Sequence, residues 1–182
     1  MVKVDVKRRY KTYNKDKFMK SEKKKKKILI IYFLTLGGIV ILLGIIILAP
    51  YLKSKSLSLN VFVYAIFSPV CHQIPSRSFF LFGYPLAVCC RCFGVYFGFF
   101  AGALLHPFLK GFSHTTLPKA KTFIIISFPL VLDTLGNFSR LWMTDNIIRF
   151  IIGFLWGLIL PFYFIAGISD YFINFRRYSK MT

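Results

Sequence analysis

The sequence predicts an all-α integral membrane protein, a bundle of about four transmembrane helices with one further re-entrant or interfacial segment. Of the 182 residues, 56% are hydrophobic, 19% aromatic and 17% charged, which is too apolar for an ordinary soluble domain. Several uncharged runs approach or exceed the roughly 20 residues that a helix needs to cross the hydrocarbon. The net charge of +19 is uneven, with more than half of it before residue 28.

The N-terminal segment, residues 1–27, carries 13 basic and three acidic side chains and ends in five consecutive lysines. Because it abuts an apolar run that starts at Ile28, we expect a disordered cytoplasmic tail. Each lysine near an anionic leaflet contributes on the order of 1 kcal/mol of attraction. The expected partners are therefore the lipid bilayer and its anionic lipids, and no nucleic acid is expected.

Residues 28–52 contain no charged side chain and are too long for the core of a signal peptide, so we expect a first span that runs outward. The later spans are expected at residues 85–109, 122–138 and 146–168. Lys110 and the loop 111–121 should then be cytoplasmic, and residues 139–145 should form an outer turn.

This topology predicts a multi-pass protein of the plasma membrane with both termini in the cytoplasm. The helical membrane domain would comprise residues 28–170, followed by a short basic tail at residues 171–182. Residues 57–82 are the exception, because their apolar part, residues 61–70, is too short to cross. We expect this segment to lie along the outer face or dip into it, packed against the bundle.

All four cysteines fall within 22 positions, as Cys71-His72 and Cys89-Cys90-Arg91-Cys92. On a helix, Cys89 and Cys92 share one face, whereas Cys90 is more simply a small buried residue. Thiolates and imidazole suit zinc, so the expected metal ligands are Cys71, His72, Cys89 and Cys92. A redox-active Cys89/Cys92 pair and a static disulfide stay open as alternatives.

Ionisable side chains inside spans normally face a partner, so Asp133 is expected to meet Arg91 or Arg149. With the expected topology these residues approach the cysteines at the outer side. Candidate catalytic residues are thus Asp133, Arg91, Arg149 and His72, although a structural ion pair is equally compatible with the sequence. Whether the protein is an enzyme is open, and a small transporter or channel is a further alternative.

Small residues recur every four positions in two predicted spans, which allows helices to approach closely. The two rows are Cys90, Gly94, Gly98 and Gly102, and Arg149, Gly153 and Gly157. If the rows pack together, the arginines at the outer end approach a common space.

The string Cys-His-Gln-Ile-Pro-Ser-Arg-Ser-Phe-Phe at 71–80, followed by Val-Cys-Cys-Arg-Cys-Phe-Gly at 88–94, resembles a family of polytopic membrane proteins, domain of unknown function 2085. Residues 129–133, with Asn146, Arg149 and Gly153, resemble its downstream pattern. The resemblance implies a shared membrane architecture but no established activity or cofactor.

The resemblance also marks candidate site residues, which are Cys71, His72, Gln73, Arg77, Ser78, Cys89, Arg91, Cys92, Asp133, Asn146 and Arg149. Of these, Gln73, Arg77, Ser78 and Asn146 are candidates for binding a substrate. For an enzyme, we expect a lipid or an anionic headgroup held by Arg77, Arg91 or Arg149.

Overall fold

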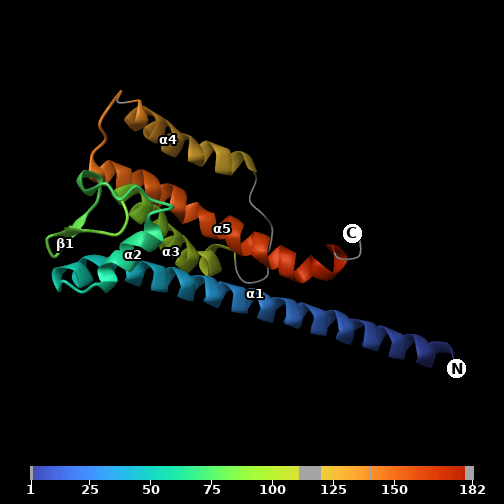
Figure 1. The fold of residues 1–182 in the computed structure, drawn as a ribbon. Helices are drawn as coiled ribbons and strands as arrows, with labels where there is room; N and C mark the ends of the chain where they lie inside the picture. The colour runs from blue at the N-terminus through green and yellow to red at the C-terminus, as the bar shows by residue number, and fades with distance from the viewer. Residues whose placement is uncertain (1, 111–119, 140, 179–182) are drawn as a thin grey trace.

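The computed structural model describes residues 2–110, 120–139 and 141–178, and it is a bundle of long helices with a small irregular cap at one end (Figure 1). The long helices are α1 (Val2–Ser54), α3 (Cys90–Lys110), α4 (Ala120–Phe138) and α5 (Asn146–Tyr178). The cap contains α2 (Leu59–Phe67), a 3-10 turn (Pro75–Arg77) and the strands β1 (Phe80–Leu81) and β2 (Tyr84–Pro85).

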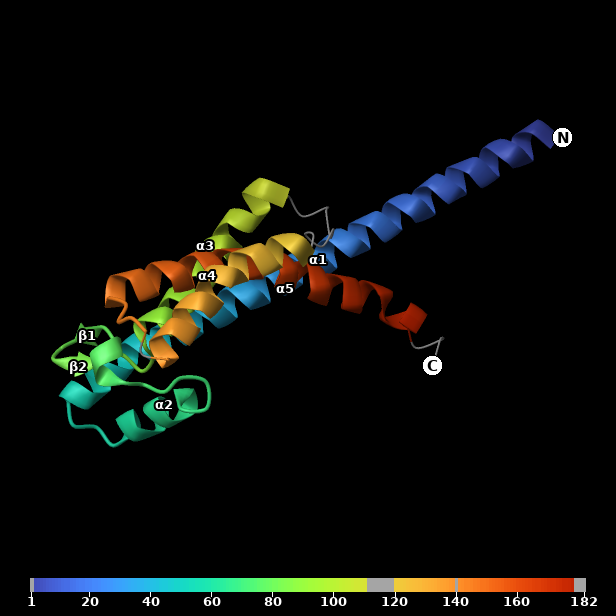
Figure 2. The ribbon, with the colours of Figure 1, turned by 90° about the horizontal axis from the view of Figure 1, so that it is seen from above.

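Four helices of the described chain are long and apolar enough to cross a membrane, which confirms the predicted fold class. Their apolar parts are Ser21–Ser54, Cys90–Leu109, Lys121–Phe138 and Asn146–Tyr171. The nine-residue α2 is too short to cross and lies against the end of α1, as expected for an interfacial segment (Figures 1 and 2).

The basic N-terminal segment differs from the expectation of a disordered tail. Helix α1 starts at Val2 and continues through this segment into the first span without a break. The start of α1 and the end of α5 both lie at the end of the bundle opposite the β strands (Figure 1). The division into a tail, a membrane domain and a second tail remains a prediction.

Helices α3 and α5 form the tightest contact of the bundle, through the two predicted rows of small residues. A Cβ added at Gly98 would lie 2.2 Å from the Phe154 carbonyl oxygen, and one at Gly153 would lie 2.2 Å from the Arg91 carbonyl oxygen. Since backbone meets backbone at these positions, only glycine fits without a shift of the helices. The two rows of small residues thus pack against each other.

The second predicted span starts five residues too early, because residues 85–89 are not helical. Phe80 pairs with Pro85 and Leu81 with Tyr84 in a two-residue hairpin. Phe82 and Gly83 form its turn with φ of 55° and 79°, the positive values that such a turn requires. The Tyr64 hydroxyl donates to the Pro85 carbonyl and holds the hairpin to α2.

A buried apolar core joins α1, α2 and the start of α3 beneath this hairpin. Ile46 and Ala49 of α1 meet Phe67 of α2 and the segment Leu86, Ala87 and Val88 that leads into α3. Cys71 belongs to this core, with Cys89 and Cys92 packed at its edge.

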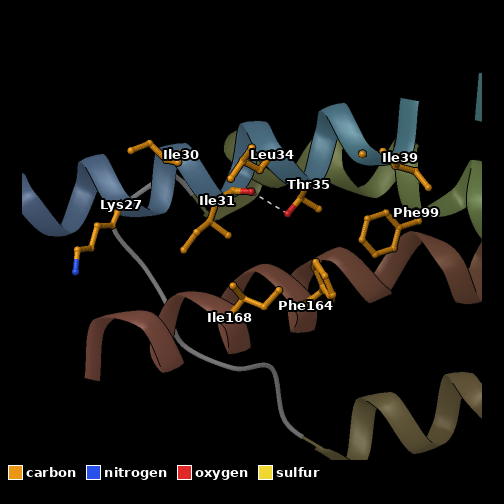
Figure 3. A pocket seen from close by; sticks show the side chains of 10 residues that line it. Lys27, Ile30, Ile31, Leu34, Thr35, Ile39, Phe99, Phe164 and Ile168 are labelled. Carbon is orange, nitrogen blue, oxygen red and sulfur yellow. Dashed lines mark hydrogen bonds between the residues drawn. The ribbon is translucent and has the colours of Figure 1, made fainter. Parts of the chain in front are cut away.

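An apolar groove of about 630 Å³ lies between α1 and the α3/α5 pair (Figure 3). Ile31, Leu34 and Ile39 of α1 face Phe99, Phe164 and Ile168 across it, with Lys27 at one end. The Thr35 hydroxyl donates to the Ile31 carbonyl at 2.8 Å and is therefore satisfied within α1. The groove thus suits contact with hydrocarbon.

Candidate metal centre and polar network

Three cysteine thiols meet where α2, the hairpin and α3 come together. The sulfur atoms of Cys71, Cys89 and Cys92 all lie within 4.8 Å of one another. Cys71 is buried, and the other two are half-buried. All four cysteines of the chain are free thiols in the structure. Cys89 and Cys92, and not Cys90, are the two thiols that lie beside Cys71.

Backbone hydrogen bonds fix the three thiols. The Cys71 N–H donates to the Phe67 carbonyl at 2.9 Å and so extends the last turn of α2. The Cys89 N–H donates to the Cys71 sulfur at 3.1 Å, and the Cys89 carbonyl accepts from Phe93 at 2.8 Å as α3 begins. Because Cys89 and Cys92 are three apart at this helix start, both side chains point the same way.

The Gln73 side chain links α2, which precedes Cys71, to the segment that precedes Cys89. Its side-chain amide donates to the Tyr64 carbonyl at 2.6 Å and to the Ala87 carbonyl at 2.8 Å. Gln73 has a φ of 51°, a left-handed conformation that turns the chain sharply after Cys71. These bonds use both amide protons and hold the two segments together, and the expected contact of Gln73 with a substrate remains a prediction.

The close approach of the thiols shifts the pKa of Cys71 and the pKa of Cys89 in opposite directions. Hydrogen bonds from Cys89 and Cys92 lower the pKa of the Cys71 thiol, because they stabilise its thiolate. The same contact with Cys71, together with burial, raises the pKa of Cys89. Cys71 is thus the thiol most readily deprotonated for metal binding or nucleophilic attack.

Two residues next to the cluster in the sequence lie outside it. His72 is exposed and does not belong to the group formed by the three thiols, because it follows Cys71 directly and the chain then turns away. Cys90 is fully buried in the contact between α3 and α5, as expected for a small packing residue.

A second group of polar side chains surrounds Asp133 of α4, which is only 5% exposed. Arg91 of α3 forms an ion pair with Asp133, as the sequence predicts. The other Asp133 carboxylate oxygen accepts from the Thr144 hydroxyl at 2.5 Å and from the Asn137 amide at 2.9 Å. The carboxylate therefore joins α3, α4 and the segment that precedes α5.

Arg149 of α5 extends this network and is only 6% exposed. Its guanidinium donates to the side-chain oxygens of Asn137 at 2.9 Å and Asn146 at 3.0 Å. Asn146 in turn donates to the Ser76 carbonyl at 3.2 Å, which connects α5 to the cap. Asn137 and Thr144 were not among the sequence candidates. Asn137 lies four residues after Asp133 and therefore on the same face of α4, and Thr144 lies two residues before Asn146. These spacings could have identified both residues.

A polar cavity of about 400 Å³ opens beside this network. It is lined by Ser76, Arg77, Met143, Thr144, Asp145, Asn146 and Arg149. Of the expected substrate-binding residues, Arg77 and Asn146 thus line the cavity. Ser78 does not, since it is buried and its hydroxyl donates to the Ile74 carbonyl at 3.0 Å.

Comparison with known proteins identifies the family. The family described as predicted membrane protein (DUF2085) matches residues 71–163, slightly more than half of the chain. The chain belongs to this family. The DUF2085 match starts at Cys71 and includes the thiol cluster, the Asp133 network and most of α5. Helices α1 and α2 lie outside it.

Two archaeal proteins described as uncharacterized are similar to this DUF2085 chain. One, from Methanocaldococcus jannaschii, is 38% identical over 124 residues, which cover 65% of this chain and 80% of the relative. The other, from Methanothermobacter thermautotrophicus, is 29% identical over 87 residues, which cover 48% of this chain and 77% of the relative. No solved structure matches the chain.

Proposed function

We propose that this DUF2085 protein is a membrane metalloprotein that binds zinc through Cys71, Cys89 and Cys92. The observation that carries the proposal is the approach of three sulfur atoms to within 4.8 Å of one another. In tetrahedral zinc sites with Zn–S bonds of about 2.3 Å, the sulfurs lie about 3.8 Å apart, so contraction by about 1 Å or less suffices. Soft thiolates also select zinc over magnesium or calcium.

The ligand count indicates what kind of zinc site this would be. Among the described His, Cys, Asp and Glu side chains, the group contains three ligands and no fourth. Closed structural zinc sites use four protein ligands, whereas sites with three leave a position for water or a substrate. The trio therefore favours an open site, in which zinc would supply Lewis-acid chemistry or a bound hydroxide near the lipid headgroups.

Metal content and free-thiol count on one non-reduced, detergent-purified sample test the proposal. About one zinc per chain is expected for the wild type, with the metal lost in Cys89→Ser/Cys92→Ser. Cys90→Ser is the matched control, because Cys90 lies outside the thiol group. Its folded fraction should keep the metal. A metal-free wild type with two blocked thiols would overturn the proposal in favour of a disulfide or a redox pair.

We propose further that the end of the bundle with the cysteine cluster faces outward and that both termini are cytoplasmic, in the plasma membrane. The lysines at residues 23–27 support this orientation through the positive-inside rule. They would also attract anionic lipids of the inner leaflet.

A further inference from the structure

Arg149 makes no ion pair within the part of the chain that the structure describes. Across residues 2–110, 120–139 and 141–178, Arg149 has no carboxylate within the 4.0 Å of an ion pair, and its recorded partners are the neutral amides of Asn137 and Asn146. Asp133, the nearest buried acid of the network, is paired with Arg91. An arginine residue that is only 6% exposed normally has an anionic partner, because neutral amides compensate the lost hydration of its charge only in part.

Other positive charges act on the same place. Arg91 of the polar network and Arg77 of the cavity wall add positive charge, and Asp133, the buried acid of the network, is already paired with Arg91. Arg77 lines the cavity together with Arg149. Asp145 also lines it, but this residue is exposed. The cavity therefore combines two guanidinium groups with a single exposed carboxylate.

The fold adds a further attraction for anions. The cavity lies at the start of α5, a helix of 33 residues, where the first N–H groups of the helix have no partner within it. This end of a helix carries partial positive charge and binds phosphate readily. Thr144 and Asn146, two neutral polar residues, also line the cavity.

We propose that this cavity binds a phosphate group, with Arg149 and Arg77 as its charged contacts. A guanidinium has five N–H donors in a planar arrangement that matches the oxygens of phosphate. In Arg149, two of these five donors bond to Asn137 and Asn146. The volume of about 400 Å³ falls within the range of small-molecule sites, about 300 to 1,000 Å³. Phosphate could come from a lipid headgroup or from a free ion, and both share this chemistry.

The test uses full-length protein in detergent and two probes. Binding of sodium phosphate is measured by titration calorimetry. Binding of phosphatidic acid is measured by native mass spectrometry, with phosphatidylcholine as the reference lipid. The key variant is Arg77→Gln. Arg77 is half-buried, so its loss should disturb folding less than the loss of Arg149. The matched control is Lys55→Gln, which removes the same charge from an exposed position beside the cap.

Saturable binding of phosphate or phosphatidic acid is expected, weakened about tenfold or more in Arg77→Gln and unchanged in Lys55→Gln. Binding of phosphatidic acid alone identifies a lipid headgroup, whereas binding of phosphate alone identifies a free ion. Binding of neither probe overturns the proposal, as does equal weakening by the two variants. Because the proposal does not depend on zinc, Cys89→Ser/Cys92→Ser should bind the probe normally.

Discussion

Consecutive residues at the start of α3 enter three different environments. Cys89 and Cys92 face the thiol cluster, Cys90 is buried against α5, and Arg91 reaches Asp133. A helix turns about 100° per residue, so Cys89, Cys90 and Arg91 point in three directions and Cys92 returns close to the direction of Cys89. One helical turn therefore contributes to both the candidate metal centre and the polar network. Residues next to each other in this segment should differ sharply in their response to substitution.

Gln73→Leu should lower the free energy of unfolding by about 1–3 kcal/mol. The substitution removes the two hydrogen bonds to the carbonyls of Tyr64 and Ala87 and leaves these groups without their donor. Thermal unfolding in detergent measures the effect. Val70→Ala, an exposed position in the same segment, is the control and should stay close to the wild type. An unchanged melting temperature in Gln73→Leu would contradict the structural role of this side chain.

Asp133→Ala should lower the free energy of unfolding by about 3–5 kcal/mol, because it leaves the charge of Arg91 uncompensated in a largely buried network. The double variant Arg91→Ala/Asp133→Ala removes both charges. It should therefore be more stable than the sum of the single effects predicts, by about 0.5–3 kcal/mol. Unfolding of all four proteins in denaturant measures this coupling, and strict additivity would refute the ion pair.

The elements differ in how far the sequence predicts them. Long apolar runs sufficed for the four spans, since these depend on local patterns. Glycine spacing indicated two faces that allow close packing, whereas the contact between α3 and α5 is a tertiary feature that spacing alone does not specify. The hairpin before α3 was missed, because Phe82 adopts a positive φ that its residue type does not suggest. The same limit applies to the site. Spacing predicts Cys89 with Cys92, whereas the position of His72 depends on a turn at Gln73.

Gly98→Ala should destabilise the protein by about 1–3 kcal/mol, since the added methyl group would lie 2.2 Å from the carbonyl oxygen of Phe154. Gly44→Ala is the matched control. Nothing lies within 4 Å of the added Cβ on α1, so this change should be neutral or stabilise the helix by up to about 1 kcal/mol. Both are compared by thermal unfolding in the same detergent. Similar behaviour of the two variants would argue against direct backbone contact.

At the scale of the whole molecule, the chemically distinctive groups gather at one end of the bundle. The thiol cluster lies on the side of α1 and α2, and the Asp133 network lies on the side of α4 and α5. The cap and the start of α5 lie at the end of the bundle opposite the start of α1 (Figures 1 and 2). This one-sided arrangement suits chemistry at a single membrane face better than a polar path across the bilayer.

Labelling of intact cells with a membrane-impermeant maleimide tests the proposed orientation. Ser56→Cys, exposed beside the cap, should react in intact cells. Ser21→Cys, exposed near the lysine run, should react only after permeabilisation, because the positive-inside rule keeps it in the cytoplasm. The wild type, with its four native cysteines, gives the background. The reverse pattern would invert the topology.

The order of the two groups along the chain has a consequence for biosynthesis. Cys71, Cys89 and Cys92 all precede residue 93, so the three thiols can meet once α1, α2 and the first turn of α3 have left the ribosome. The Asp133 network cannot close until Arg149 has been translated and α5 has started to insert. The thiol cluster can therefore form before the polar network is complete.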